Sequence, residues 1–127
     1  LLQRALAEYV GAGKMEAHLK TMRPIYAKKC ETLSRSLAEH CAQYVRFNKP
    51  KGGFFLWVEC VGPKARDVMQ EAATEGVIFP VGATFFVNGD KDDTTHLRMA
   101  FCTATVEELE EAGIRLRRAF DRAIGEK

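Results

Sequence analysis

The sequence lacks the features that would place the chain in a membrane or on a nucleic acid. No apolar run comes near the roughly 18 residues that a membrane-spanning helix needs. The 19 lysine and arginine residues nearly balance the 17 aspartate and glutamate residues, which leaves a net charge of +2. A charge of this size does not indicate a nucleic-acid partner. We therefore expect neither a membrane nor a nucleic acid among the partners.

A secretory signal and an initiator methionine are also missing. The chain starts with Leu1 and Leu2 inside an apolar helical pattern, without the charged segment and apolar stretch of a signal peptide. Its 127 residues are enough for one domain and too few for two. We expect a piece of a longer protein that works in the cytoplasm, with mitochondria as the alternative location.

Metal-binding and phosphate-binding motifs are absent or incomplete. The four cysteines form no C-x-x-C motif and no pair with histidine at zinc spacing. Because each lies in an apolar stretch, we expect buried thiols. The segment 11–14 lacks the first glycine and the serine or threonine of a phosphate-binding loop. The acidic segment 90–93 lacks the glycine and glutamate that a calcium loop requires.

Hydrophobic periodicity predicts helices alternating with short strands. Helices are expected at residues 2–10, 19–41, 64–75 and 105–124. Pro24 should either start or kink the second helix, and Thr105 with Glu108 forms a capping box for the last. Strands are expected at 44–47, 54–60, 77–79 and 96–101, with a further candidate at 85–87. This order predicts an α+β fold: a small, mostly antiparallel sheet with helices packed on one face.

Strand alternation turns one arginine away from the expected core. Leu97, Met99 and Phe101 share one face of their strand, and Arg98 points to the other. In the 54–60 strand, Phe54, Leu56 and Val58 share a face opposite Phe55, Trp57 and Glu59. If helices cover the first face, the second carries two large aromatics and an arginine. Such a guanidinium suits a planar anion bound by two hydrogen bonds; the alternative is an internal salt bridge, for example to Glu59.

Five segments, in this order, resemble the C-terminal small domain of class I/II, fold-type-I pyridoxal-phosphate aminotransferases. The nearest branch is the aminoadipate and kynurenine aminotransferases. The segments are Gly52–Val58, Gly76–Phe79, Gly82–Phe86, Leu97–Phe101 and the 105–124 helix, and His18–Arg23 with Tyr26 resembles the family's long helix leading into this domain. The resemblance implies that residues 1–16 form a helix linking from a preceding large domain, and that residues 17–127 form the small domain.

The resemblance also implies an activity, the transfer of an amino group between an amino acid and a 2-oxo acid. Arg98 matches the family arginine that binds the substrate α-carboxylate, and Phe55 and Gly53 match positions at the substrate pocket. The family places the Schiff-base lysine, the aspartate on the cofactor ring and the phosphate site in the N-terminal large domain. We therefore expect no catalytic residue in this chain and no pyridoxal phosphate bound to it alone. The full-length enzyme would bind the cofactor, contact its own large domain and form a homodimer.

Besides an aminotransferase domain, two further classes of function stay open at this point. The same fold could serve a pyridoxal-phosphate enzyme that does not transaminate, or the effector domain of an aminotransferase-like transcription regulator; an upstream helix-turn-helix would favour the regulator. The third possibility is a free-standing α+β binding module.

Overall fold

The computed structural model of the chain describes residues 1–87 and 94–125. The rejected calcium motif at 90–93 lies outside these residues. Within them the elements are, in chain order, α1 (Leu2–Gly11), α2 (Lys14–His40), β1 (Val45–Phe47), β2 (Phe55–Cys60), α3 (Ala65–Thr74), the 3-10 helix η1 (Gly82–Phe85), β3 (His96–Ala100) and α4 (Val106–Ile124).

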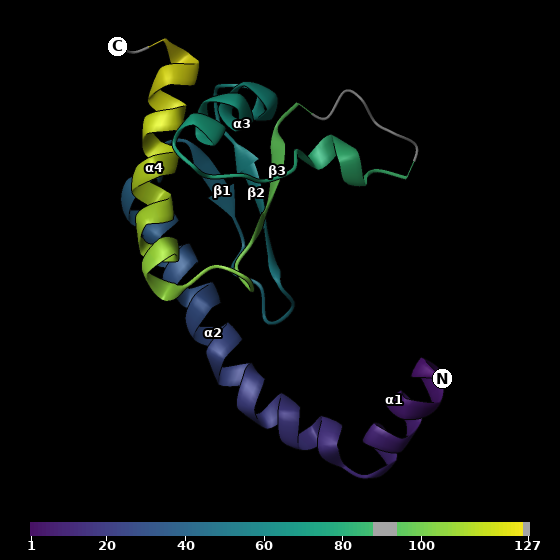
Figure 1. The fold of residues 1–127 in the computed structure, drawn as a ribbon. Helices are drawn as coiled ribbons and strands as arrows, with labels where there is room; N and C mark the ends of the chain where they lie inside the picture. Colours follow the sequence, from purple (N-terminus) through teal and green to yellow (C-terminus); the bar gives the residue numbers. More distant parts are fainter. Residues whose placement is uncertain (88–93, 126–127) are drawn as a thin grey trace.

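The three strands form an antiparallel sheet in the order β1-β2-β3. Val45 pairs with Cys60 across the first ladder, and Val58 pairs with Leu97 across the second. In Figure 1, α2 and α4 lie along one side of this sheet and η1 lies on the other. The α+β prediction, with helices on one face of a small antiparallel sheet, is confirmed.

The core lies between the sheet and the helices. Its fully buried side chains come from every layer: Leu33, Leu37, Leu56, Val58, Val68, Leu97, Phe101, Leu116 and Phe120. The cysteines are thiols, as predicted; Cys30, Cys41 and Cys60 are buried, but the expected burial is wrong for Cys102, which is half-buried. Helices α2 and α4 approach closely at Gly113, whose backbone N–H donates to Ser36 Oγ over 3.0 Å. The predicted capping box opens α4, since Glu108 N–H donates to Thr105 Oγ1 over 3.2 Å.

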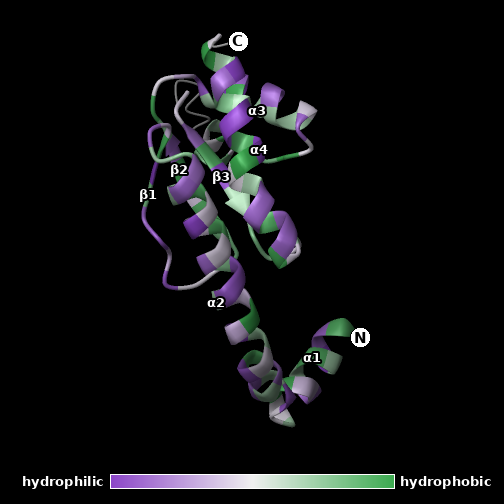
Figure 2. Ribbon diagram, turned by 90° about the vertical axis from the view of Figure 1, so that its left-hand side faces the viewer, coloured by the Kyte–Doolittle hydropathy of each residue, from purple (hydrophilic) through white to green (hydrophobic). Residues whose placement is uncertain are grey.

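The N-terminal part of the chain extends away from this core. Helix α1 has no buried residue, and burial along α2 begins at Cys30. Figure 1 shows α1 and the first half of α2 projecting from the sheet, and Figure 2 shows hydrophobic residues at the exposed start of α1. Helix α2 runs through Pro24 and so does not begin there. The predicted domain boundary at residue 16 falls in the first turn of α2. No helix in the described part of the chain is long and apolar enough to cross a membrane.

Two of the predicted strands are wrong. Residues 77–79 form no strand; beside them only an isolated bridge joins Val81 to Leu97. Pro80 has no N–H to donate, so a ladder cannot continue through this segment. The 85–87 candidate is also not a strand, because Phe85 ends the 3-10 helix η1.

The prediction that Phe54 belongs to the core face of the sheet is also wrong. Phe54 was expected beside Leu56 and Val58, but it precedes the first residue of β2 and is half exposed. It packs edge-on against Tyr26 of α2, with ring centroids 5.3 Å apart. Strand alternation therefore does not apply to it.

Candidate functional site

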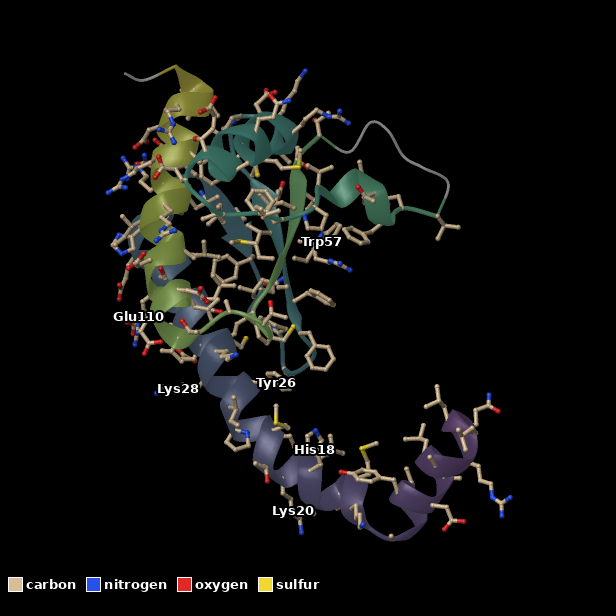
Figure 3. The ribbon with its side chains drawn as sticks, in the orientation of Figure 1. His18, Lys20, Tyr26, Lys28, Trp57 and Glu110 are labelled. Carbon is tan, nitrogen blue, oxygen red and sulfur yellow. The ribbon has the colours of Figure 1, made fainter. Side chains whose placement is uncertain are left out.

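The face of the sheet opposite the helices carries aromatic side chains around one arginine. Trp57 pairs with Arg98 across β2 and β3, so both side chains stand on this face. Phe55 shares it, whereas Leu56 and Leu97 are fully buried on the helix side. Figure 3 shows Trp57 on the side of the sheet that faces η1. The face assignment made for Phe55, Trp57 and Arg98 is confirmed.

The guanidinium of Arg98 lies between two aromatic rings. Its central carbon is 4.0 Å from the centroid of the Phe55 ring and 3.8 Å from that of Phe85. Among residues 1–87 and 94–125 it forms no ion pair, so the alternative of a salt bridge to Glu59 is wrong. Its Nε is buried without a hydrogen-bond partner. A buried donor without a partner costs free energy, and an anion bound at this site could supply the acceptor.

The segment around η1 brings Phe85 to the arginine. The Arg98 backbone N–H donates to Pro80 O over 3.1 Å, which attaches the segment to the outer edge of β3. Five residues later, the ring of Phe85 lies against the guanidinium, 3.8 Å from its central carbon to the ring centroid. Sequence periodicity missed this residue because the contact depends on how an irregular segment folds back. The signal that could have found it is its place in the Gly82–Phe86 segment, one of the five that carried the family resemblance.

The predicted site residues do not all converge. The structure brings Phe55 and Arg98 into contact. Gly53 adopts a positive φ of 89° in the turn before β2. It borders an open groove of about 610 Å³ between this turn and the first half of α2, which Tyr26 and Phe54 also line. Arg98 is not among the residues that line this groove, so Gly53 and Arg98 face different spaces.

A second polar cluster lies on the helix side and joins the turn before β1 to α4. Tyr44 donates to Asp121 Oδ1 over 2.6 Å, and Arg117 Nε donates to both carboxylate oxygens, at 2.9 and 3.1 Å. Burial opposes the charged carboxylate, but these hydrogen bonds together outweigh it, so the pKa of Asp121 is lowered. The hydrogen bond to Asp121 in turn raises the pKa of Tyr44. The Arg117 guanidinium is therefore already paired with a protein carboxylate.

No group of three or more histidine, cysteine or acidic side chains within residues 1–87 and 94–125 could hold a metal ion. The candidate site therefore consists of Arg98 and its aromatic walls.

Comparison with known proteins shows that the fold is that of an aminotransferase small domain. The family model for aspartate amino-transferase matches residues 4–118. A 2-aminoadipate transaminase of Thermus thermophilus is 34% identical over 102 residues, covering 80% of this chain and 25% of that protein. An uncharacterised HTH-type transcriptional regulator of Bacillus subtilis, YdfD, is 23% identical over 87% of this chain and 22% of its own length.

A solved structure gives the same result. The crystal structure of LysN, an α-aminoadipate aminotransferase from Thermus thermophilus complexed with N-(5′-phosphopyridoxyl)-L-leucine, matches with a TM-score of 0.81 and 29% identity. The match covers 94% of this chain and 30% of that one. The chain belongs to the aspartate aminotransferase family and matches the C-terminal domain of these enzymes. It spans about a quarter of the length of the relatives it matches.

Proposed function

We propose that this chain is the C-terminal domain of a pyridoxal-phosphate aminotransferase, in which Arg98 binds the α-carboxylate of the amino-acid and 2-oxo-acid substrates. The observation that carries the proposal is the Arg98 guanidinium, which stands on the face of the sheet opposite α2 and α4 and forms no ion pair with any acidic side chain among residues 1–87 and 94–125. Arginine matches a carboxylate with two parallel hydrogen bonds. The aromatic walls limit access of water and so strengthen that pairing.

The contribution of these residues to the reaction is orientation. A carboxylate held by two hydrogen bonds fixes the bonds at the substrate α-carbon relative to whatever reacts with them. Phe55 forms one wall of the carboxylate site, and we assign Gly53 to the neighbouring turn at the edge of the substrate pocket. The enzyme's side-chain specificity would then depend mainly on residues outside this chain.

Pyridoxal phosphate would supply the electron sink for the reaction when bound to the full-length enzyme. The residues around Arg98 fit a substrate carboxylate and do not fit this cofactor. The side chains packed against the guanidinium are phenyl rings, which cannot form a Schiff base or hold a phosphate. We propose that a preceding large domain binds the cofactor, and that the enzyme works as a homodimer closed over the substrate by this domain.

Substitution of Arg98 in the full-length protein tests the proposal. Truncating one partner of a partly buried charge pair costs about 2–5 kcal/mol, so Arg98→Ala should lower kcat/KM for L-2-aminoadipate or L-leucine by about 30- to several-thousand-fold. Arg98→Lys keeps the positive charge but not the planar pair of donors, so it should lower kcat/KM less than Arg98→Ala does. Isopentylamine, which is leucine without its carboxylate, should react equally well with all three proteins.

Arg46 offers a matched control. It lies opposite Glu59 in the ladder between β1 and β2, and Glu59 shares the face of Trp57 and Arg98. Its guanidinium donates to the backbone oxygens of Ala42 and Val45. Arg46→Ala should leave the discrimination between leucine and isopentylamine unchanged. If Arg98→Ala slows both substrates equally, Arg98 does not bind the carboxylate. Sequence-specific DNA binding without turnover of any amino acid would instead support the regulator.

A further inference from the structure

Phe85 is the feature of this site that the proposed function does not yet use. The guanidinium carbon of Arg98 lies over the Phe85 ring, 3.8 Å from the centroid, and over the Phe55 ring, 4.0 Å from the centroid. We propose that Phe85 is a positioning residue, which fixes the plane of the Arg98 guanidinium for two-pronged binding of the substrate carboxylate. The proposal rests on the proposed function of Arg98 and goes one step beyond it.

Arg98 needs such support because no hydrogen bond within the described residues orients its side chain. Its Nε is buried without a partner, and arginine is among the side chains that lose most rotamer entropy when they are fixed. A two-pronged contact forms only when the guanidinium plane and the carboxylate plane align. Because no described residue accepts a hydrogen bond from the guanidinium, its contacts with the two rings are what restrict its orientation.

The two rings differ in what holds them. Phe55 belongs to β2, whose pairing with β3 fixes it relative to Arg98. Phe85 comes from η1, and its position depends on a short segment attached at two points. The backbone of Pro80 accepts the Arg98 N–H over 3.1 Å, and Trp57 packs edge-on against the Phe85 ring, with centroids 6.3 Å apart. The segment therefore holds Arg98 at its backbone and at its guanidinium.

Phe86 provides a closely matched control. It is 41% exposed against 39% for Phe85, and its ring meets Trp57 at 6.2 Å and 69°, against 6.3 Å and 76°. Arg98 contacts the rings of Phe55 and Phe85, whereas no such contact is formed with Phe86 within the described part of the chain. Replacing either phenylalanine by leucine removes a similar area and the same kind of contact with Trp57. Only one of the two replacements removes a wall of the arginine site.

The kinetic test uses the full-length enzyme with leucine and isopentylamine. Phe85→Leu should lower kcat/KM for leucine about 5- to 30-fold, which is about 1–2 kcal/mol at about 1.4 kcal/mol per tenfold change. Most of the loss should be a higher KM, because the clamp binds substrate before and during the reaction alike. Isopentylamine should be unaffected. Phe85→Tyr keeps the ring and should restore the parent values, and Phe86→Leu should change neither substrate.

A second readout is independent of activity. The guanidinium carbon of Arg98 lies over both rings, at 4.0 and 3.8 Å from their centroids, so ring currents should shift the NMR signal of the adjacent Nε–H proton upfield in the 127-residue chain. Phe85→Leu should move this signal downfield, and Phe86→Leu should leave it in place. An unchanged signal in Phe85→Leu would overturn the proposal.

The kinetic outcomes separate the two proposals. If Arg98→Ala discriminates between leucine and isopentylamine but Phe85→Leu behaves like Phe86→Leu, the positioning role is wrong and the carboxylate role stands. If Arg98→Ala does not discriminate, the carboxylate role fails, whatever Phe85→Leu does.

Discussion

Replacing Gly113 by alanine should destabilise the domain, although alanine is the better helix former. Gly113 lies inside α4 where the helix meets α2. A Cβ atom there would stand 2.3 Å from the backbone oxygen of Ser36 and 2.4 Å from its hydroxyl. The nearest atom belongs to the backbone, so no side-chain rotation relieves the clash. The two helices would have to move apart by about 1 Å.

The expected loss of stability combines one stabilising and two destabilising effects. Alanine favours the helix over glycine by about 1 kcal/mol. Overpacking of a tight contact costs about 1–3 kcal/mol. Separating the helices also weakens two hydrogen bonds of Ser36 Oγ, from Gly113 N–H at 3.0 Å and to Glu110 O at 2.7 Å, at about 1 kcal/mol each. The sum is a loss of about 2–4 kcal/mol, or roughly 8–16 °C in Tm for a domain of this size.

Urea and thermal unfolding of the 127-residue chain, followed by circular dichroism, measure this loss. Gly11→Ala is the matched control, since nothing lies within 4 Å of a Cβ there, and it should change stability by no more than about 0.5 kcal/mol. Adding Ser36→Ala to Gly113→Ala should recover little, because the carbonyl clash persists. If Gly113→Ala is as stable as Gly11→Ala, the close helix contact is wrong.

Three further predictions concern buried groups and the cofactor. Burial raises the pKa of the Cys41 thiol to about 12, so Cys41 should resist alkylation at neutral pH in mass spectrometry while the half-buried Cys102 reacts first; faster labelling of Cys41 would contradict its burial. Because the pKa of Asp121 is lowered, the carboxylate stabilises the fold above the ordinary carboxyl pKa, and this stabilisation is lost as the pH falls through the lowered pKa. Asp121→Asn should therefore flatten the acid side of a plot of Tm against pH. An unchanged plot would exclude this role. The 127-residue chain alone should bind no pyridoxal phosphate, and a saturable, borohydride-reducible adduct at one lysine in an absorbance titration would contradict that.

The sequence predicted those parts of the fold that a local pattern determines. The period-two alternation in β2 and β3 correctly assigned Leu56 and Leu97 to the core and Trp57 and Arg98 to the opposite face. The capping box correctly located the start of α4 at Val106. These features succeed because each depends on residues a few positions apart.

The sequence could not predict contacts that depend on how distant segments meet. Phe85 and Arg98 are separated by a segment that lacks a regular pattern, so nothing local indicates that the phenyl ring lies against the guanidinium. The strand predicted at 77–79 is wrong for a related reason. Its apolar residues alone do not show whether another strand lies close enough to pair with this segment, where an isolated bridge from Val81 to Leu97 is what forms. The hydrogen bond from Tyr44 to Asp121 joins positions 77 apart in the chain.

A comparison of two arginines separates binding from structure in this domain. Arg117 and Arg98 both lie against aromatic rings, at 5.1 Å from Tyr44 and at 3.8 Å from Phe85. Arg117 also donates to both oxygens of Asp121, whereas Arg98 Nε is buried without a partner. Methionine fills a similar volume in each place without the charge. Arg117→Met should therefore lower the Tm of the 127-residue chain clearly, because it leaves Asp121 without its cation.

Arg98→Met should lower the Tm little or raise it, since it removes a buried donor that has no acceptor. Arg98 would then be a half-buried residue that the fold does not need for its stability. This is typical of ligand-binding residues, because binding sites often keep side chains that cost stability but are needed for function. Thermal unfolding of the two variants side by side measures the contrast. If Arg98→Met costs as much as Arg117→Met, Arg98 supports the fold, and both its carboxylate role and the role of Phe85 in positioning it lose their basis.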